Sequence, residues 1–108
     1  ILIKHPKLFT AARAHSKDMG CNHFVSHTSP ITGNVYQRIT SLNYSFSFAG
    51  ENIATGYNNA DDLFAGWMTS LEHKDNMLNP DFSEIGIGFA SIEESDFRSY
   101  VTAVFASP

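Results

Sequence analysis

Three side chains suited to proton transfer or metal binding lie in separate polar blocks of this 108-residue chain. His27 lies among serine, threonine and proline in residues 24–30, Glu51 begins the block 50–56 between Gly50 and Asn52, and His73 lies in residues 66–76. Neutral imidazoles and carboxylates are ligands of Zn²⁺, and they also act as general acids and bases. Two histidines and one carboxylate therefore predict either a weak divalent-metal site with open coordination positions or an acid–base site.

Ser70 offers a second chemistry, because it lies three residues before His73. In a helix, residues at this spacing share one face, so Ser70, His73 and Glu51 could form a Ser-His-Glu set like that of a hydrolase. No Gly-x-Ser-x-Gly nucleophile elbow surrounds Ser70, and no oxyanion loop is recognisable. The pattern favours a binding site and keeps a hydrolase as the alternative.

Glu51 precedes an apolar run, so we expect its carboxylate to be partly buried and to need a partner. It could hold a metal-binding side chain in place, act as a general base, or fix a loop through backbone N–H groups. We expect Asn52 beside it to close a turn.

Two further residues carry weaker signals. His23 and His27 have the spacing of a helical metal pair, but the Ser, Thr and Pro residues around them predict a loop, with His23 at the surface. Cys21 is the only cysteine, which excludes an intrachain disulfide. We expect it to be a small buried hydrophobic residue rather than a catalytic partner of His23.

Composition limits the class of protein. Apolar residues make up 43% of the chain, which indicates one folded domain over residues 1–108. No apolar run approaches the ~20 residues that a membrane span requires. The formal net charge of −4, with Lys and Arg dispersed, argues against nucleic acid as a partner.

Hydrophobic periodicity predicts three helices. The first covers residues 6–19, with Pro6 near its start, Gly20 as its stop and an apolar stripe that includes His15. A short helix covers residues 34–42. A second long helix should be capped by Asp61 or Asp62 and continue through His73, with Trp67 in the core.

The β-rich segments follow or separate these helices. Residues 43–59 are predicted to be extended, and residues 85–92 and 100–105 form a hairpin around a polar turn. We expect Gly86 and Gly88 to mark close approach by another element. The alternating apolar residues of both hairpin strands should pack against helices (Ile85, Ile87, Phe89, Val101, Ala103 and Phe105). This order of elements predicts an α+β fold.

Taken together and in order, the blocks around His27, Glu51 and His73 resemble the CAP superfamily, in particular the secreted SCP-like domains of bacteria. The resemblance runs from Leu8 to Phe105 and implies an α/β/α sandwich with a cleft lined by two histidines and two acidic residues. His27, Glu51 and His73 match three of these positions. Ser70 replaces the fourth, an acidic residue in a Trp-x-x-Glu pattern, which weakens any mechanism that needs paired carboxylates.

The resemblance also implies a location and a function. We expect a secreted or cell-envelope domain that binds an extracellular protein, lipid or cell-wall component without catalysis. We expect His27 and His73 to hold Zn²⁺ or another divalent metal weakly, with Glu51 and Ser70 lining the cleft. The alternatives are a metal- or Ser70-dependent hydrolase that uses His73 and Glu51, or a purely structural domain.

The N-terminal part departs from the family pattern. Relatives usually have a helix before the segment that corresponds to residues 8–19, and this sequence contains none, nor does it begin with a signal peptide. We therefore expect the chain to be a fragment or mature piece of a longer protein, or a domain that does without that helix.

Overall fold

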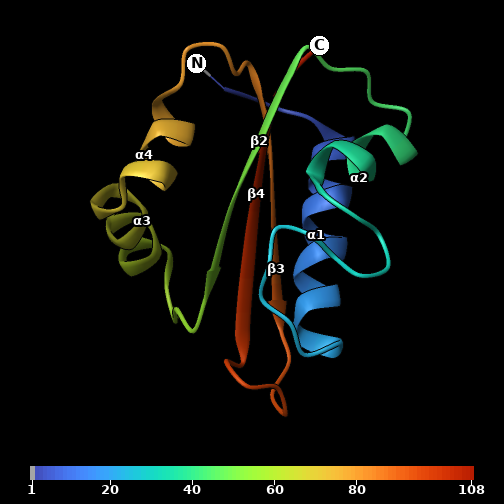
Figure 1. The fold of residues 1–108 in the computed structure, drawn as a ribbon. Coiled ribbons are helices and arrows are strands. Elements are labelled where there is room, and N and C mark those ends of the chain that lie inside the picture. Colours follow the sequence, from blue (N-terminus) through green and yellow to red (C-terminus); the bar gives the residue numbers. More distant parts are fainter. Residues whose placement is uncertain (1) are drawn as a thin grey trace.

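The computed structural model describes residues 2–108, which form three layers with a central sheet (Figure 1). Two helices cover one face, α1 (Pro6–Cys21) and α2 (Val35–Ser41), and two cover the other, α3 (Ala60–Thr69) and α4 (Leu71–Leu78). The sheet has the strand order β1-β3-β4-β2, made of β1 (Ile3–Lys4), β2 (Phe48–Thr55), β3 (Glu84–Ser91) and β4 (Ser99–Ser107). The predicted α/β/α sandwich is confirmed.

Helix α1 has the predicted start and a later end. Pro6 occupies its first turn, and the backbone N–H of Lys7 donates to Nδ1 of the N-cap residue His5 over 3.1 Å. Gly20 does not stop the helix, because it lies inside the last turn, where a Cβ atom would collide with the side chains of Ile92 and Tyr100. The helix instead ends at Cys21, which is exposed, so the expectation of a buried cysteine is wrong.

Strand β4 lies in the middle of the sheet and forms most of the core. It pairs antiparallel with β3, as the hairpin pattern predicted, and antiparallel with β2 on its other side. With helices on both faces, residues 99–106 are all buried. Because both faces are covered, residues that flank the alternating Val101, Ala103 and Phe105, such as Val104 and Ala106, are apolar as well.

The two faces of β3 differ sharply. Gly86 and Gly88 face α1, where added Cβ atoms would lie 2.1 Å from the backbone carbon of Leu8 and 2.1 Å from the backbone nitrogen of Arg13. The predicted close approach is therefore confirmed. On the opposite face Ile87 and Phe89 are 43% and 60% exposed, so the expectation that they pack against helices is wrong.

The predicted second long helix consists of two helices. Asn59, rather than Asp61 or Asp62, caps α3, and its Oδ1 accepts a hydrogen bond from the backbone N–H of Asp62 over 2.8 Å. The extended backbone of Ser70 (φ −104°, ψ 120°) then separates α3 from α4. Trp67 is buried as expected. Hydrogen bonds described below join α4 to β2.

Two smaller elements complete the fold. A capping box begins α2, in which the Asn34 side chain accepts from the backbone N–H of Gln37 and the Gln37 side chain accepts from that of Asn34. The two-residue strand β1, which the sequence did not predict, pairs parallel with the start of β3.

Throughout residues 2–108, every helix is too short or too polar to cross a membrane.

Candidate functional site

Glu51 lies at the centre of a polar cluster between β2, α1, α2 and the loop that carries His27. Its side chain is almost completely buried, and Arg38 donates from Nη1 to Oε2 over 2.5 Å and from Nη2 to Oε1 over 3.1 Å. His27 Nδ1 lies 2.9 Å from the same Oε1. The expectation that Glu51 is buried with a partner is confirmed. Because both carboxylate oxygens are already bonded, Glu51 supports His27 and is poorly placed to act as a metal ligand itself.

Arg38 is the main residue of this cluster that sequence reasoning missed. It is 5% exposed and also donates from Nη2 to the carbonyl oxygen of His27 over 2.6 Å, and from Nε to that of Gly33 over 3.3 Å. One guanidinium therefore fixes both the carboxylate and the loop that carries His27. Its signal in the sequence was its spacing from Val35, which places both residues on the buried face of a short helix.

His15 completes the cluster from the buried face of α1. Its Nε2 lies 2.9 Å from the carbonyl oxygen of Ser26 and 3.9 Å from Glu51 Oε1. Since a carbonyl oxygen only accepts hydrogen bonds, Nε2 carries the hydrogen, and Nδ1 of the neutral ring is an acceptor. This buried Nδ1 has no hydrogen-bond partner among residues 2–108. The expected place of His15 on the apolar stripe of α1 is confirmed, but its polar role was not predicted.

The environment sets the charges of the cluster. Burial alone would raise the pKa of Glu51, but hydrogen bonds from His27 and Arg38 outweigh burial and hold that pKa below its usual value. The hydrogen bond to Glu51 raises the pKa of His27. Burial lowers the pKa of His15 and keeps its ring neutral near pH 7. The cluster thus holds one paired carboxylate, one guanidinium and one neutral buried imidazole.

A second set of hydrogen bonds attaches α4, which carries His73, to the same strand. Asn52 Nδ2 donates to the carbonyl oxygen of His73 over 3.0 Å. Asn76 Nδ2 donates to Asn52 Oδ1 over 2.9 Å and to the carbonyl oxygen of Glu51 over 3.1 Å. Asn52 therefore joins a strand to a helix, and the expectation that it closes a turn is wrong. The neighbouring residues Glu51 and Asn52 fix the elements that carry the two histidines.

His73 is partly buried beside Trp67, with their ring centroids 6.2 Å apart. Its Nδ1 is buried and makes no hydrogen bond to any residue in the described part of the chain. Burial, and then the positive charge of His27, lower the pKa of His73. His27 and Glu51 are in contact, and Asn52, the residue after Glu51, bonds the backbone of His73. That the two imidazoles meet stays a prediction.

The remaining candidates lie outside this arrangement or at its border. Ser70 is the residue between α3 and α4; its side chain makes no capping bond, and within residues 2–108 no hydrogen bond joins it to His73. The predicted helical Ser70–His73 face is therefore wrong. His23 lies in the loop expected for it, exposed and with a positive φ of 57°.

The side chains present partly suit a metal ion. His27 can donate its Nδ1 hydrogen to Glu51 and leave Nε2 as a ligand, which is the usual arrangement of a carboxylate that orients a metal-binding histidine. His73 adds a second imidazole with an unbonded nitrogen. No group of three or more His, Cys, Asp or Glu side chains with metal-site geometry occurs in residues 2–108. His27 and His73 are thus the two candidate ligands of the predicted site.

Comparison with known proteins identifies the family. Residues 5–105 match the CAP family, described as the cysteine-rich secretory protein family. The chain belongs to the CAP family. It is 39% identical over 82 residues to the uncharacterized protein YkwD of Bacillus subtilis and 36% identical over 77 residues to the uncharacterized membrane protein YlbC of the same organism. These matches cover 76% and 71% of this chain but only 32% and 22% of the two relatives.

Solved structures agree with this assignment. An extracellular protein containing an SCP domain from Bacillus anthracis is 30% identical, with a TM-score of 0.87 over 100% of this chain and 34% of that protein. An outer surface protein of Borrelia burgdorferi shares the fold, with a TM-score of 0.88 at 24% identity over 98% of this chain and 77% of that one. The chain spans about a third or less of the length of the two Bacillus subtilis relatives. The part that they share with it is a CAP domain.

Proposed function

We propose that this CAP domain is an extracellular binding domain without catalytic activity of its own. The observation that carries this proposal is the pairing of Glu51, whose two oxygens are bonded to Arg38 and His27. A general base must accept a proton from the reacting group, and a carboxylate held in a charged pair with a lowered pKa is a poor acceptor. The extracellular location is supported by the Bacillus anthracis and Borrelia proteins, one extracellular and the other an outer surface protein.

The same geometry gives little support to the hydrolase alternative. Ser70 has extended backbone at a helix junction, and its hydroxyl has no hydrogen bond to an activating histidine among residues 2–108. Nucleophilic catalysis by serine requires such a base. Incubation with a mixed peptide library should yield no cleavage above that of a Ser70→Ala variant. Cleavage by the wild type that is lost in Ser70→Ala would favour the hydrolase.

We further propose that the binding site includes a weakly held divalent metal ion, with His27 and His73 as its protein ligands. Glu51 would orient His27 through Nδ1 and raise its basicity, and Arg38 would fix Glu51. When bound, Zn²⁺ would supply open coordination positions for an electron-donating group of a ligand. Because core packing holds the domain together, the protein should stay folded without the ion.

Calorimetric titration of Zn²⁺ into untagged protein near pH 7 tests the metal site. Replacing a ligand, as in His27→Ala or His73→Ala, should weaken Zn²⁺ binding by about tenfold or more, because removing even the groups that orient a metal ligand lowers metal affinity by about that factor. His23→Ala is the matched control, because His23 is an exposed histidine in the same loop as His27. It should leave the affinity unchanged. Equal affinities for wild type, His27→Ala and His73→Ala would exclude these two ligands.

A further inference from the structure

A small cavity, which we call the turn cavity, lies where the turn between β3 and β4 meets the loop that follows α1. This turn is at the opposite end of the molecule from both chain termini (Figure 1). The turn cavity has a volume of about 190 Å³, below the roughly 300–1,000 Å³ of pockets for drug-sized ligands. It can therefore hold a small chemical group. Three aromatic rings, a carboxylate, an imidazole and a valine line it (His23, Phe24, Val25, Asp96, Phe97 and Tyr100).

The walls of the turn cavity are held in place by packing and hydrogen bonds. Tyr100 is 2% exposed, and its hydroxyl oxygen accepts a hydrogen bond from the backbone N–H of Phe97 over 3.3 Å. On the other wall, the backbone N–H of Phe24 donates to the carbonyl oxygen of Met19 over 3.2 Å. The Phe24 ring also packs on the buried ring of His15, with centroids 5.9 Å apart. The aromatic walls are therefore formed before a ligand arrives.

The backbone on both sides of the turn cavity has an unusual conformation. Among residues 2–108, three residues other than glycine have a positive φ, and two of them adjoin the cavity, His23 at 57° and Arg98 at 67°. Residues with a Cβ atom rarely adopt this conformation, and where they do they concentrate at functional sites. The two segments that meet here are thus shaped at some cost, which favours a binding role.

The turn places negative charge around the cavity. Residues 93–98 contain three carboxylates, those of Glu93, Glu94 and Asp96, against the single guanidinium of Arg98. Asp96 is exposed, and its side chain makes no ion pair or hydrogen bond within residues 2–108. The faces of aromatic rings also attract positive charge. The lining therefore favours a cationic ligand.

The hydrogen-bonding groups of the lining select the kind of cation. A primary ammonium has three N–H donors, and each needs an acceptor when it is buried. Besides the Asp96 carboxylate, the lining side chains offer only the His23 ring and the Tyr100 oxygen. That oxygen already accepts from Phe97. A quaternary ammonium has no N–H group, and aromatic rings recognise it through their faces. We propose that the turn cavity binds the quaternary ammonium group of a small ligand.

Choline tests the proposal against the neutral alcohol in which a carbon atom replaces its nitrogen, because the two have the same shape. Each is titrated into isotope-labelled protein, and the backbone amides are followed by NMR. Choline should shift the amides of residues 23–25 and 96–100 and bind about fivefold to tenfold tighter than the alcohol, with a smaller difference at high salt. Ethanolamine, a primary ammonium, should bind more weakly than choline. Equal affinities for choline and the alcohol, or tighter binding of ethanolamine, would overturn the proposal.

A ring-removing variant tests the aromatic contact. Phe97→Leu keeps an apolar side chain in the wall, so it should weaken choline by about fivefold and change the affinity of the alcohol by less than about twofold. Phe48→Leu is the matched control, since Phe48 on β2 is 52% exposed, close to the 48% of Phe97, and lies outside the lining. It should leave the affinity for choline unchanged. Circular dichroism checks that both variants fold.

A charge-removing variant tests the carboxylate. Asp96→Asn should weaken choline by about threefold at low salt and leave the alcohol unaffected. Glu94→Gln removes a carboxylate of the same turn that does not line the cavity, so it should have the smaller effect. A larger effect of Glu94→Gln would mean that choline senses only the overall charge of the turn.

Two sources of the ligand can be separated. Vesicles of phosphatidylcholine present the same group at a membrane surface, and vesicles of phosphatidylglycerol are the control. Sedimentation with the first but not the second, lost in Phe97→Leu, assigns the group to a lipid headgroup. Binding of choline without binding of vesicles assigns it to a soluble ligand. The proposal fails if choline does not shift residues 23–25 and 96–100, or if Phe97→Leu leaves these shifts unchanged.

Discussion

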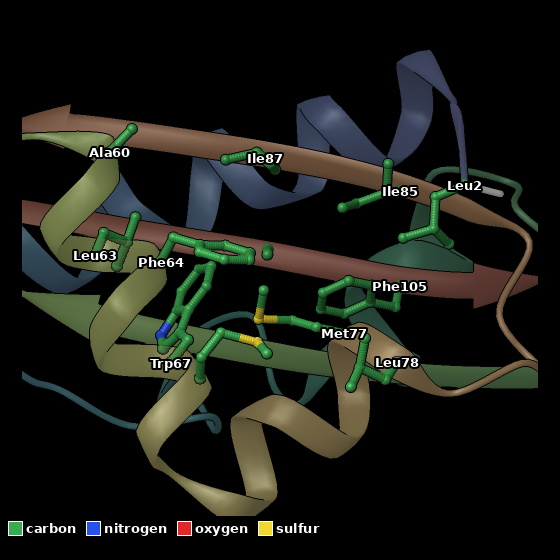
Figure 2. A pocket seen from close by; sticks show the side chains of 12 residues that line it. Leu2, Ala60, Leu63, Phe64, Trp67, Met77, Leu78, Ile85, Ile87 and Phe105 are labelled. Carbon is green, nitrogen blue, oxygen red and sulfur yellow. The ribbon is translucent and has the colours of Figure 1, made fainter.

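The polar cluster around Glu51 lies on the α1 and α2 face of the sheet, and an apolar groove lined by α3, α4 and β3 lies on the other face (Figure 2). The two regions differ in how fully their side chains are buried and bonded. In the cluster, each charged group has a partner, and hydrogen bonds from Asn52 and Asn76 fix the adjoining helix α4. In the groove, phenylalanine, leucine and isoleucine side chains remain exposed. Burying an unpaired charge costs far more free energy than exposing an apolar side chain. The buried charges of the cluster must therefore be paired, whereas apolar side chains of the groove can stay exposed.

From this contrast we expect the largest loss of stability when Arg38 is replaced. Arg38→Ala should lower the free energy of unfolding by about 3–5 kcal/mol, because it leaves the buried carboxylate of Glu51 without its guanidinium partner. Urea denaturation measures the change. Arg13→Ala is the control, since Arg13 is an exposed arginine on α1 whose loss should cost less than about 0.5 kcal/mol. Similar losses for the two variants would mean that the cluster contributes no more than surface charge.

Substitutions on the two faces of β3 should destabilise the fold less, and by different amounts. Gly88→Ala should destabilise by about 1–3 kcal/mol, because its Cβ would lie 2.1 Å from the backbone nitrogen of Arg13 in α1. Ile87→Ala, one residue earlier and on the groove face, should cost about 1 kcal/mol, since the side chain is partly exposed. Thermal denaturation of both variants checks this order. The reverse order would show that the groove face is packed more tightly than the α1 face.

The smallest expected effect concerns pH and His15. Burial lowers the pKa of His15 in the folded state, so the unfolded chain binds more protons as pH falls through the unperturbed value of about 6.5. His15 should therefore add to stability above that pH and reduce it progressively below. Urea denaturation from pH 7.5 to 5 should give a flatter profile for His15→Gln than for the wild type. Parallel profiles would mean that another group causes the slope.

Local patterns were sufficient to predict most of the fold. The helix periodicity from Pro6, the hairpin predicted from residues 85–92 and 100–105, and the glycines at 86 and 88 all correspond to observed features. Each of these signals depends on nearby residues or on one neighbouring element, so it can be recognised in the sequence. The blocks around His27 and Glu51 likewise indicated two residues that the fold brings into contact.

Where sequence reasoning failed, distant residues decide the outcome. The stretch from Asp61 through His73 reads as one helix, but Ser70 separates α3 from α4, and Asn52 and Asn76 join α4 to β2. Phe89 was expected to pack against a helix, but its side chain is 60% exposed.

The sequence by itself determined the α+β class, the CAP resemblance and the candidate residues for a site. Only the tertiary structure decided what those residues can do. Arg38 looked like one more basic residue until the packing of α2 against β2 placed its guanidinium on Glu51. The reason is physical: a residue type fixes which bonds a side chain can make, whereas the free energy of those bonds depends on burial and partners that only the folded chain supplies.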